Sequence, residues 1–453
     1  MNNNYIPKAF YFTLMIVGIF SLLSLVNFSN ITLGFPIKPI SIFSDILSDD
    51  SAQLNVPLVL DSLAQAGDSH PAGVVYFQNY TNNKFPLDSV IIHILDAKAG
   101  RSKVRIAWYG DSFTDGDIMV SDLRDTLQHI YGGNGVGFVP ITSETSGFRQ
   151  SVVHSFSGWS TTSIITNPRS GRFGINGFSY KPDSGNYLRY SGTNQFRHTR
   201  LFNTFRLFYS SHRSSQSSIL INRKDRRMVT LPASLTPGMI TINSANMRQV
   251  NASIADTGIV TCYGASLEDE TGIYIDNFSI KGNSGIGLMA IPGKTLAKFD
   301  SLLHYDLIVL QFGLNVASAK TIDFSNYVKS MTHLVSKLRR SFPDTPILLL
   351  SVSDRSTRLQ GEFVTMPVIP YLIRAQEKIA ADNKLLFWNL FEAMGGQNSM
   401  AKYANAKPPL ANKDYTHLNY AGGRKIGISL ARSFIHEVDS YQERRKSIEN
   451  KKN

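Results

Sequence analysis

The chain has 453 residues, of which 42% are hydrophobic, 18% charged and 11% aromatic, a composition typical of a globular protein and not of a disordered or fibrous one. Lys and Arg total 46 against 34 Asp and Glu, and the formal net charge of +12 favours anionic partners such as acidic polysaccharides or a membrane surface. The sequence carries no nucleic-acid module and no long basic stripe, so we expect no nucleic-acid partner. The single cysteine, Cys262, excludes an intramolecular disulfide, and its strand-like neighbours predict a buried, inert thiol.

The N-terminal segment predicts export. Residues 9–26 form an uncharged apolar run, and a helix of this length spans about 27 Å, close to the thickness of the hydrocarbon layer of a bilayer. No small-x-small cleavage site follows, so we expect residues 1–27 to be a retained anchor in the cytoplasmic (inner) membrane, with a cleaved signal peptide as the alternative. Lys8 before the run favours a folded part on the extracytoplasmic, periplasmic side. The irregular, polar residues 28–84 are interpreted as a linker.

From residue 85 the chain alternates between helical and strand patterns, and the alternation returns after residue 264. We expect helices near 88–95, 118–130, 327–340, 370–382 and 421–438, and strands at 104–109, 307–311, 346–351 and 385–388. Such alternation predicts a three-layer α/β/α fold with a parallel sheet, built from residues 85–144 and 265–440. The basic tail, residues 441–453, is interpreted as a solvated, frayed end.

Residues 145–264 have a different texture, rich in Gly, Ser, Thr, Asn and aromatic residues. Short strands are predicted at 187–190, 204–209 and 239–242. This pattern predicts an inserted antiparallel β-sandwich or jelly roll. Trp159 is a candidate for stacking on a sugar ring, but core packing is the favoured interpretation.

Ser112 is the candidate nucleophile. It follows Gly110 at the end of a predicted buried strand, where open α/β sheets place their sites. A serine hydroxyl needs an adjacent base, and at the start of the following helix its own N–H would help to bind an oxyanion. The alternative is a helix-capping serine. Asp115 and Asp117 are interpreted as helix-capping carboxylates and not as acid/base groups.

His417 is the candidate base, with Asp414 three residues earlier in the loop before the last predicted helix. This spacing lets the carboxylate reach the ring Nδ1 and select the tautomer. Asn315 follows a buried strand and Gly313, so its amide is a candidate oxyanion donor. Two glycine segments are candidates for a backbone donor, Gly282 and the run over residues 132–137.

These segments together resemble the SGNH (GDSL-type) hydrolase superfamily, which is named for its Ser, Gly, Asn and His. In the resemblance Ser112 matches the nucleophile, His417 the base and Asp414 its orienter, while Asn315 matches an oxyanion donor. The resemblance covers about residues 85–440. It implies acyl transfer through an acyl-enzyme, with no metal or organic cofactor.

A narrower resemblance is to the peptidoglycan O-acetylesterase branch. It is carried by Gly110-Asp111-Ser112, residues 122–128 and the Gly-Gly-Asn-Gly-Val-Gly-Phe-Val-Pro run at 132–140. That branch has a β insertion like a carbohydrate-binding module and places its oxyanion glycine in a short Asn/Gly turn after it, which implies Gly282. Lys281 departs from the branch, which usually has Asn before this glycine.

The expected function is that of a serine esterase, an acetylesterase, that removes O-acetyl groups from an acetylated polysaccharide outside the cytoplasm, with peptidoglycan favoured. The resemblance implies an oxyanion hole made of the N–H groups of Ser112 and Gly282 and the side chain of Asn315. Two alternatives stay open: an O-acyltransferase that uses the same triad, and a non-catalytic glycan-binding protein of the cell envelope.

Overall fold

The structure is a computed structural model that describes residues 74–318 and 321–451. None of the helices in this part of the chain is both long enough and apolar enough to cross a bilayer. The membrane anchor expected over residues 1–27 lies outside the described residues, as does most of the expected linker over residues 28–84.

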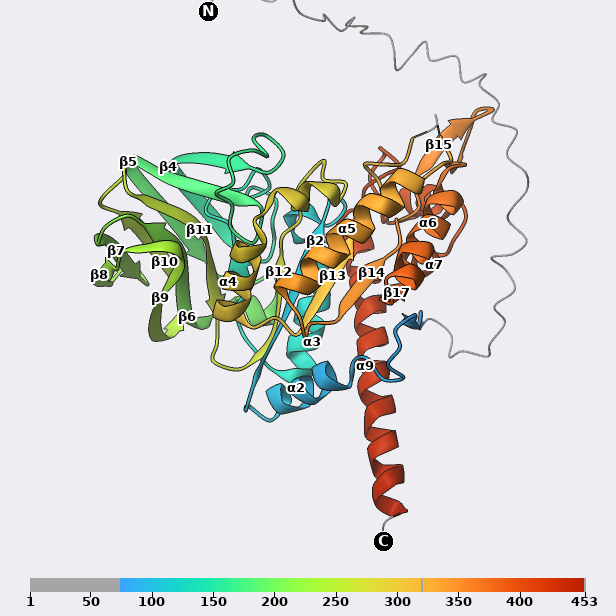
Figure 1. The fold of residues 1–453 in the computed structure, drawn as a ribbon, viewed down its shortest axis with the longest axis horizontal. Coiled ribbons are helices and arrows are strands. Elements are labelled where there is room, and N and C mark those ends of the chain that lie inside the picture. The colour runs from blue at the N-terminus through green and yellow to red at the C-terminus, as the bar shows by residue number, and fades with distance from the viewer. Residues whose placement is uncertain (1–73, 319–320, 452–453) are drawn as a thin grey trace, which may run out of the picture. The chain divides into compact units, whose positions relative to one another are not determined.

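A six-stranded sheet lies at the centre of the α/β part (Figure 1). In spatial order its strands are β1 (Gln78–Asn79), β17 (Leu386–Trp388), β14 (Ile347–Leu350), β13 (Leu307–Gln311), β2 (Lys103–Gly110) and β12 (Gly272–Asn277). All neighbours are parallel except β1 and β17, so the expected parallel sheet is confirmed. The sequence did not reveal β1, which lies in the expected linker and has two residues, or β12, which directly follows the β-rich segment.

The order of the parallel strands defines where a ligand is expected to bind. Chain order is β2, β12, β13, β14, β17, whereas spatial order is β12, β2, β13, β14, β17. The direction of winding therefore reverses between β2 and β13. In open α/β sheets the crevice at this reversal, outside the carboxyl ends of the strands, is the usual ligand site.

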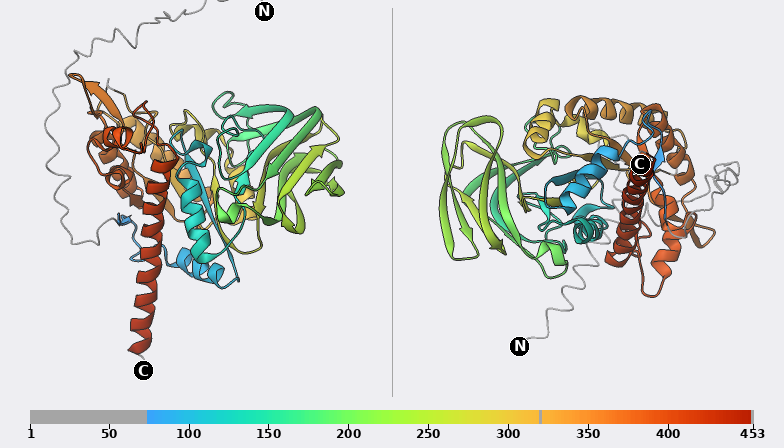
Figure 2. Two further views of the ribbon diagram at one scale, coloured as in Figure 1. Left: turned by 180° about the vertical axis from the view of Figure 1, so that it is seen from behind. Right: turned by 90° about the horizontal axis from the view of Figure 1, so that it is seen from below.

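Helices cover the two faces of this sheet (Figures 1 and 2). On one face are α2 (Asp88–Lys98), α3 (Val120–Tyr131) and α9 (Tyr420–Asn450), and on the other are α4 (Gly293–Leu303), α5 (Ser325–Ser341) and α6 (Ile369–Asp382). Two short helices, α7 (Leu390–Met394) and α8 (Ser399–Asn405), follow β17.

Two helix predictions need correction. Helix α3 begins at Val120 and not at Ile118, because Ile118 is extended and Met119 has a φ of 71°. The last helix continues to Asn450, so the expected frayed tail is wrong for most of its length. Arg444 in that extension forms an ion pair with Asp88 of α2 at 2.5 Å, which fastens the helix to the body.

The β-rich part is a single hydrogen-bonded antiparallel sheet of nine strands, drawn in green tones in Figure 1. In chain order these are β3 (Gly137–Val139), β4 (Val153–Ser163), β5 (Phe178–Ser191), β6 (Phe202–Ser211), β7 (Ser215–Ile221), β8 (Asp225–Leu231), β9 (Ser234–Met247), β10 (Gln249–Ile254) and β11 (Val260–Glu268). The three strands expected here fall within β5, β6 and β9 and are confirmed.

The β-rich sheet has a hydrophobic core of its own. Cys262 lies fully buried in this core on β11, and burial raises its pKa, so the expected inert thiol is confirmed. Trp159 packs against the same core and donates its indole N–H to the carbonyl oxygen of Tyr187 at 2.9 Å, so core packing is also confirmed.

A buried ionic cluster joins the two sheets. Arg105 on β2 donates to both carboxylate oxygens of Asp276 on β12, at 2.9 and 2.7 Å, and forms a second ion pair with Glu268 at the end of β11. Asp276 also accepts the backbone N–H of Phe138 on β3 at 2.8 Å. Burial opposes ionisation of Glu268, but the cations around it outweigh burial and lower its pKa to about 2. These ion pairs and hydrogen bonds link β2 and β12 of the parallel sheet to β3 and β11 of the β-rich sheet.

Candidate active site

The structure brings Ser112, His417 and Asp414 into one chain of hydrogen bonds. Ser112 Oγ lies 2.9 Å from His417 Nε2, and His417 Nδ1 lies 2.7 Å from Asp414 Oδ2. Ser112 and His417 are 305 positions apart in the sequence. Strand β2 carries the serine to the crevice between β2 and β13, and the loop before α9 carries the histidine to it. A hydroxyl, an imidazole and a carboxylate in this order can generate a nucleophilic alkoxide.

The loop that holds His417 orders the carboxylate of Asp414. Asp414 Oδ1 accepts the backbone N–H groups of Thr416 and His417, at 2.9 and 3.0 Å, which leaves Oδ2 for the ring. Burial would raise the pKa of Asp414, but the hydrogen bonds from His417 and Thr416 outweigh it and hold the pKa below its ordinary value. An anionic carboxylate accepts the Nδ1 proton, so Nε2 is left to take the proton of Ser112.

Ser112 does not lie at a helix N-terminus, contrary to expectation. A turn follows it, then a 3-10 turn at Asp115–Asp117, and α3 begins only at Val120. The neighbouring Asp111 is fully buried, and its carboxylate accepts the N–H of Phe113 at 3.0 Å. Burial raises the pKa of Asp111 to about 6, although that hydrogen bond and the nearby His417 favour its ionised form. The nucleophile is therefore positioned by a tight turn and gains no support from a helix dipole.

Asn315 is held next to the nucleophile. Its amide Nδ2 donates to the carbonyl oxygen of Asn283 at 3.0 Å and lies 3.4 Å from Asp111 Oδ2. Gly313 has a φ of 142°, and a Cβ at this position would come within 2.7 Å of the Cβ of Val352. Only glycine fits such a crossing, so the backbone is fixed two residues before the exposed amide.

The two glycine candidates lie at opposite ends of β2. Gly282 belongs to a turn in which the N–H of Ile280 donates to the carbonyl oxygen of Gly110 at 3.1 Å, two residues before Ser112. The run over 132–137 instead packs its Gly133 against Gly272, which pairs with Lys103 at the first residue of β2. The turn that holds Gly282 therefore lies at the end of β2 that leads into Ser112, whereas the earlier run lies at the other end.

The backbone N–H groups of Ser112 and Gly282 are the candidate donors to an oxyanion. Over residues 74–318 and 321–451, no hydrogen bond satisfies the N–H of Ser112 or of Gly282. Gly282 has a φ of 78°, and no atom outside its chain neighbours lies within 4 Å of the position of a Cβ. Both N–H groups can donate to a ligand, as an oxyanion hole requires.

A cavity of about 280 Å³ opens over the Ser112–His417 pair, and we call it the catalytic pocket. Its remaining lining residues are Phe113, Asp115, Ile118, Glu144, Thr145, Phe148, Lys281, Asn412 and Leu418. Apolar side chains and a few polar ones share this lining, a combination that is typical of small-ligand sites. The cavity thus has room for a small acyl group beside the serine.

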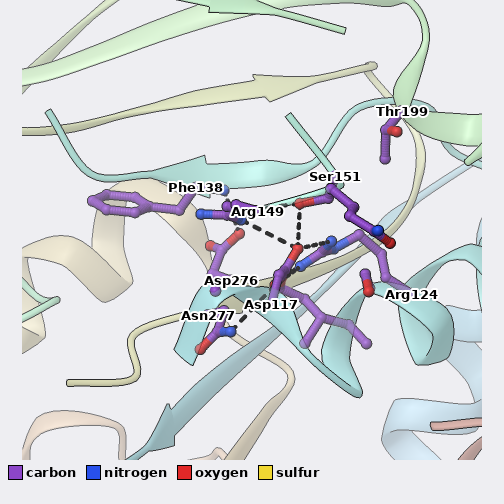
Figure 3. Close-up of polar contacts among 12 residues, drawn as sticks. Asp117, Arg124, Phe138, Arg149, Ser151, Thr199, Asp276 and Asn277 are labelled. Carbon is purple, nitrogen blue, oxygen red and sulfur yellow. Dashed lines mark hydrogen bonds and ion pairs between the residues drawn. The ribbon is translucent and has the colours of Figure 1, made fainter. Parts of the chain in front are cut away.

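Asp117 is the centre of a buried polar network (Figure 3). Its carboxylate accepts two hydrogen bonds from Arg124, at 2.8 and 3.0 Å, and one each from Arg149, Ser151 and Asn277, at 3.3, 2.5 and 3.2 Å. Burial would raise the pKa of Asp117, but Arg124 and Arg149 hold it well below its ordinary value. The helix-capping interpretation of Asp115 and Asp117 is therefore wrong, because α3 has no side-chain cap.

A hairpin that the sequence did not reveal packs against the loop that holds Asp414 and His417. Its strands are β15 (Ser356–Leu359) and β16 (Glu362–Thr365). Ser356 donates its N–H to the carbonyl oxygen of Tyr415 at 3.0 Å, and Phe363 stacks on the Tyr415 ring with centroids 3.7 Å apart. Tyr415 lies between Asp414 and His417 and has a φ of 54°. The only signal available in the sequence was a turn-forming residue, Gly361, close to the aromatic Phe363.

Comparison with known proteins rests on the fold. No protein-family model matches the chain, and no curated protein matches it in sequence. A peptidoglycan O-acetylesterase structure superimposes with a TM-score of 0.65 and 21% identity, over 80% of this chain and 99% of that one. A salicylyl-acyltransferase from a tetracycline biosynthetic pathway (13% identity, 66% of this chain, 96% of that chain) and a family two carbohydrate esterase from Cellvibrio japonicus (10% identity, 64% and 98%) have TM-scores of only 0.30 and 0.26. The fold of this chain is therefore similar to that of the peptidoglycan O-acetylesterase.

Proposed function

We propose that the protein is a serine esterase that removes O-acetyl groups from an extracytoplasmic polysaccharide, with peptidoglycan as the substrate. The observation that carries this proposal is the continuous Ser112–His417–Asp414 hydrogen-bond chain at the carboxyl end of the sheet. The likeness of the fold to a peptidoglycan O-acetylesterase supports the choice of polymer. The formal net charge of +12 suits an anionic cell-envelope polymer.

The proposed reaction proceeds through an acetyl-enzyme. His417 Nε2 takes the proton of Ser112 while Oγ attacks the ester carbonyl carbon, and the imidazolium then gives that proton to the departing sugar oxygen. The negative oxygen of the tetrahedral intermediate accepts hydrogen bonds from the N–H groups of Ser112 and Gly282. It also accepts the amide N–H of Asn315 that lies 3.4 Å from Asp111 Oδ2 in the free protein. Water, deprotonated by His417, attacks the acetyl-enzyme and releases acetate and the free serine.

The cellular setting of this reaction is part of the proposal. Residues 1–27 would anchor the chain in the cytoplasmic membrane, and the catalytic part would face the periplasm. Residues 145–264 would form an inserted β-sandwich domain that contributes to glycan binding. The uncharged run at 9–26 supports the first statement, and the antiparallel strands β4 to β11, of which only the end of β11 lies beyond residue 264, support the second.

Comparison of Ser112→Ala with wild type tests the chemistry. We expect the full chain to release acetate from O-acetylated peptidoglycan and to hydrolyse 4-nitrophenyl acetate, and Ser112→Ala to lose about 10⁴-fold or more of kcat. Ser301→Ala is the matched control, because Ser301 lies on the exposed surface of α4. Equal slow rates for wild type and Ser112→Ala would refute the enzymatic proposal and leave a glycan-binding role.

The same triad can pass the acetyl group to a sugar hydroxyl in place of water. The side chains of His417 and Asp414 are 34% and 47% exposed, so an acceptor sugar can approach the acetyl-enzyme. Mass analysis of the glycan products separates the two reactions. Acetate in solution indicates a hydrolase, whereas an acetylated acceptor without free acetate indicates a transferase.

A further inference from the structure

We propose that a second cavity beside the catalytic pocket binds the sugar residue next to the acetylated one. This inference rests on the proposed polysaccharide substrate and adds a binding site to it. The cavity, which we call the sugar pocket, has a volume of about 320 Å³. That volume lies at the lower end of the range for small-ligand sites.

The sugar pocket is formed by both parts of the protein. Thr161 and Ser163 on β4, Ile165 just after it and Phe178 at the start of β5 come from the β-rich sheet. Asn277 at the end of β12 and residues 279–281 come from the chain that follows β12 toward Gly282. A ligand in this pocket would therefore contact the β-rich sheet while it remains close to the turn that holds the oxyanion glycine.

The sugar pocket adjoins the catalytic pocket. Asp115, Glu144, Thr145 and Lys281 line both cavities. A glycan whose acetylated residue lies over Ser112 would thus extend past these four side chains into the sugar pocket. Two other surface hollows, one beside Tyr263 and one beside His198, share no lining residue with the catalytic pocket.

The lining of the sugar pocket matches the two kinds of surface on a pyranose ring. Pro140, Ile165 and Phe178 supply an apolar wall for its C–H face. Thr142, Thr161 and Asp115 supply hydroxyl and carboxylate groups for its hydroxyls, and the Thr142 and Thr161 hydroxyls lie 2.8 Å apart. A few polar groups beside an apolar wall are typical of small-ligand sites.

Lys281 adds a cation to this lining. No carboxylate lies within 4.0 Å of its ammonium group in residues 74–318 and 321–451. Its three N–H donors can therefore bind sugar hydroxyls, an amide carbonyl or a carboxylate of the polymer.

Hydrogen bonds hold the side chain of Arg149 in the sugar pocket. Arg149 lines the pocket and is held by Asp117, at 3.3 Å, and by Ser151, at 3.0 Å (Figure 3). Asp117 is in turn held by the buried Arg124. A side chain that is held in place before binding loses less conformational entropy when a ligand enters the pocket.

Blocking the sugar pocket tests this inference. Ile165 is 44% exposed, so Ile165→Trp can fill the pocket without repacking the core. Met228→Trp is the matched control, because Met228 is 64% exposed on β8 and lines neither cavity. The ester substrates are mono-O-acetylated N-acetylglucosamine and mono-O-acetylated N,N′-diacetylchitobiose. Binding of unacetylated N,N′-diacetylchitobiose, followed by ligand-observed NMR, reports on the pocket independently of catalysis.

We expect wild type and Met228→Trp to have kcat/KM about tenfold higher for the disaccharide ester than for the monosaccharide ester, equivalent to about 1.4 kcal/mol of binding. Ile165→Trp should lose this preference, bind chitobiose about tenfold more weakly and hydrolyse 4-nitrophenyl acetate at the wild-type rate. An unchanged preference and unchanged chitobiose affinity in Ile165→Trp would overturn the sugar pocket. Absence of ester hydrolysis together with Ile165-dependent chitobiose binding would overturn the esterase proposal and keep the pocket.

Discussion

Replacing Asp117 by Asn should destabilise the protein strongly, although the two side chains have the same shape. Asp117 and its main partner Arg124 have side chains that are each 1% exposed. The carboxylate accepts five hydrogen bonds, of which three come from the guanidinium groups of Arg124 and Arg149. The substitution removes the carboxylate charge that forms an ion pair with each of these two cations and turns one acceptor oxygen into a donor NH₂ group.

The loss of stability in Asp117→Asn can be estimated from these hydrogen bonds and ion pairs. A hydrogen bond to a charged group contributes about 1.5–3 kcal/mol, and removal of one partner of a buried ion pair costs about 3–5 kcal/mol because it leaves an uncompensated buried charge. The five hydrogen bonds share partners, so their contributions do not add. We therefore expect Asp117→Asn to lower the free energy of unfolding by about 3–5 kcal/mol.

Urea titration followed by tryptophan fluorescence measures this change. The matched control is Asp225→Asn, which breaks an ion pair to Arg227 of similar length, 2.7 Å, between side chains that are 48% and 37% exposed. An exposed pair contributes at most about 1 kcal/mol. If Asp117→Asn and Asp225→Asn lower the free energy of unfolding by the same amount, the buried network does not have the role that we assign to it.

The remaining predictions concern the active site. Asp414→Asn should lower kcat for 4-nitrophenyl acetate by roughly 10²–10⁴-fold, because the amide no longer stabilises the imidazolium of His417. Asn315→Ala should lower kcat by about 10²–10³-fold with little change in KM, because its donor acts on the oxyanion. With the pKa of Asp111 raised to about 6 from an ordinary 3.8, folded Asp111 keeps a proton between these pH values that the unfolded chain has lost, so stability falls as pH rises through them. Asp111→Asn should abolish this loss, which is on the order of 3 kcal/mol, in urea titrations at pH 4 and 7.

Each of these variants has a control or an outcome that contradicts it. Asp382→Asn, which alters an exposed ion pair with Lys378, should leave kcat unchanged, as should Asn243→Ala on the exposed side of β9. A kcat within threefold of wild type for Asp414→Asn would argue against its role as orienter. A change in KM alone for Asn315→Ala would indicate ground-state binding. If the free energy of unfolding changes equally between pH 4 and 7 in wild type and in Asp111→Asn, the Asp111 carboxyl is ionised throughout this range.

The secondary structure was predictable where burial follows a local period. Strand β13 is a continuous apolar run because both of its faces are covered, and helix α5 repeats apolar residues at helical spacing because one of its faces packs on the sheet. Strand β1 and helix α7 escaped prediction because two and five residues carry too little periodicity. The start of α3 was misplaced because Met119 is apolar and buried yet lies at a positive φ.

The buried polar groups were less predictable than the apolar core. Asp117 is an ordinary helix-start residue by local pattern, and only the arrival of Arg149 and Asn277 from other segments makes it the centre of a network. The contact of Phe363 with Tyr415 likewise joins two segments that nothing in their local sequence connects. Side-chain pairing over such separations depends on which elements become neighbours in the fold.

The sequence by itself determined the alternating α/β pattern, the β-rich segment within it and the residue types that a serine esterase needs, because each of these depends on residues close together in the chain. The tertiary structure decided which of those residues meet. The winding reversal between β2 and β13 places Ser112 beside Asn315, and α9 anchors the loop that brings His417 within 2.9 Å of the serine. The tertiary structure also placed Gly282 at the carboxyl end of β2 and the 132–137 run at its amino end. The direction and the order of the strands define these two ends, and local sequence encodes neither.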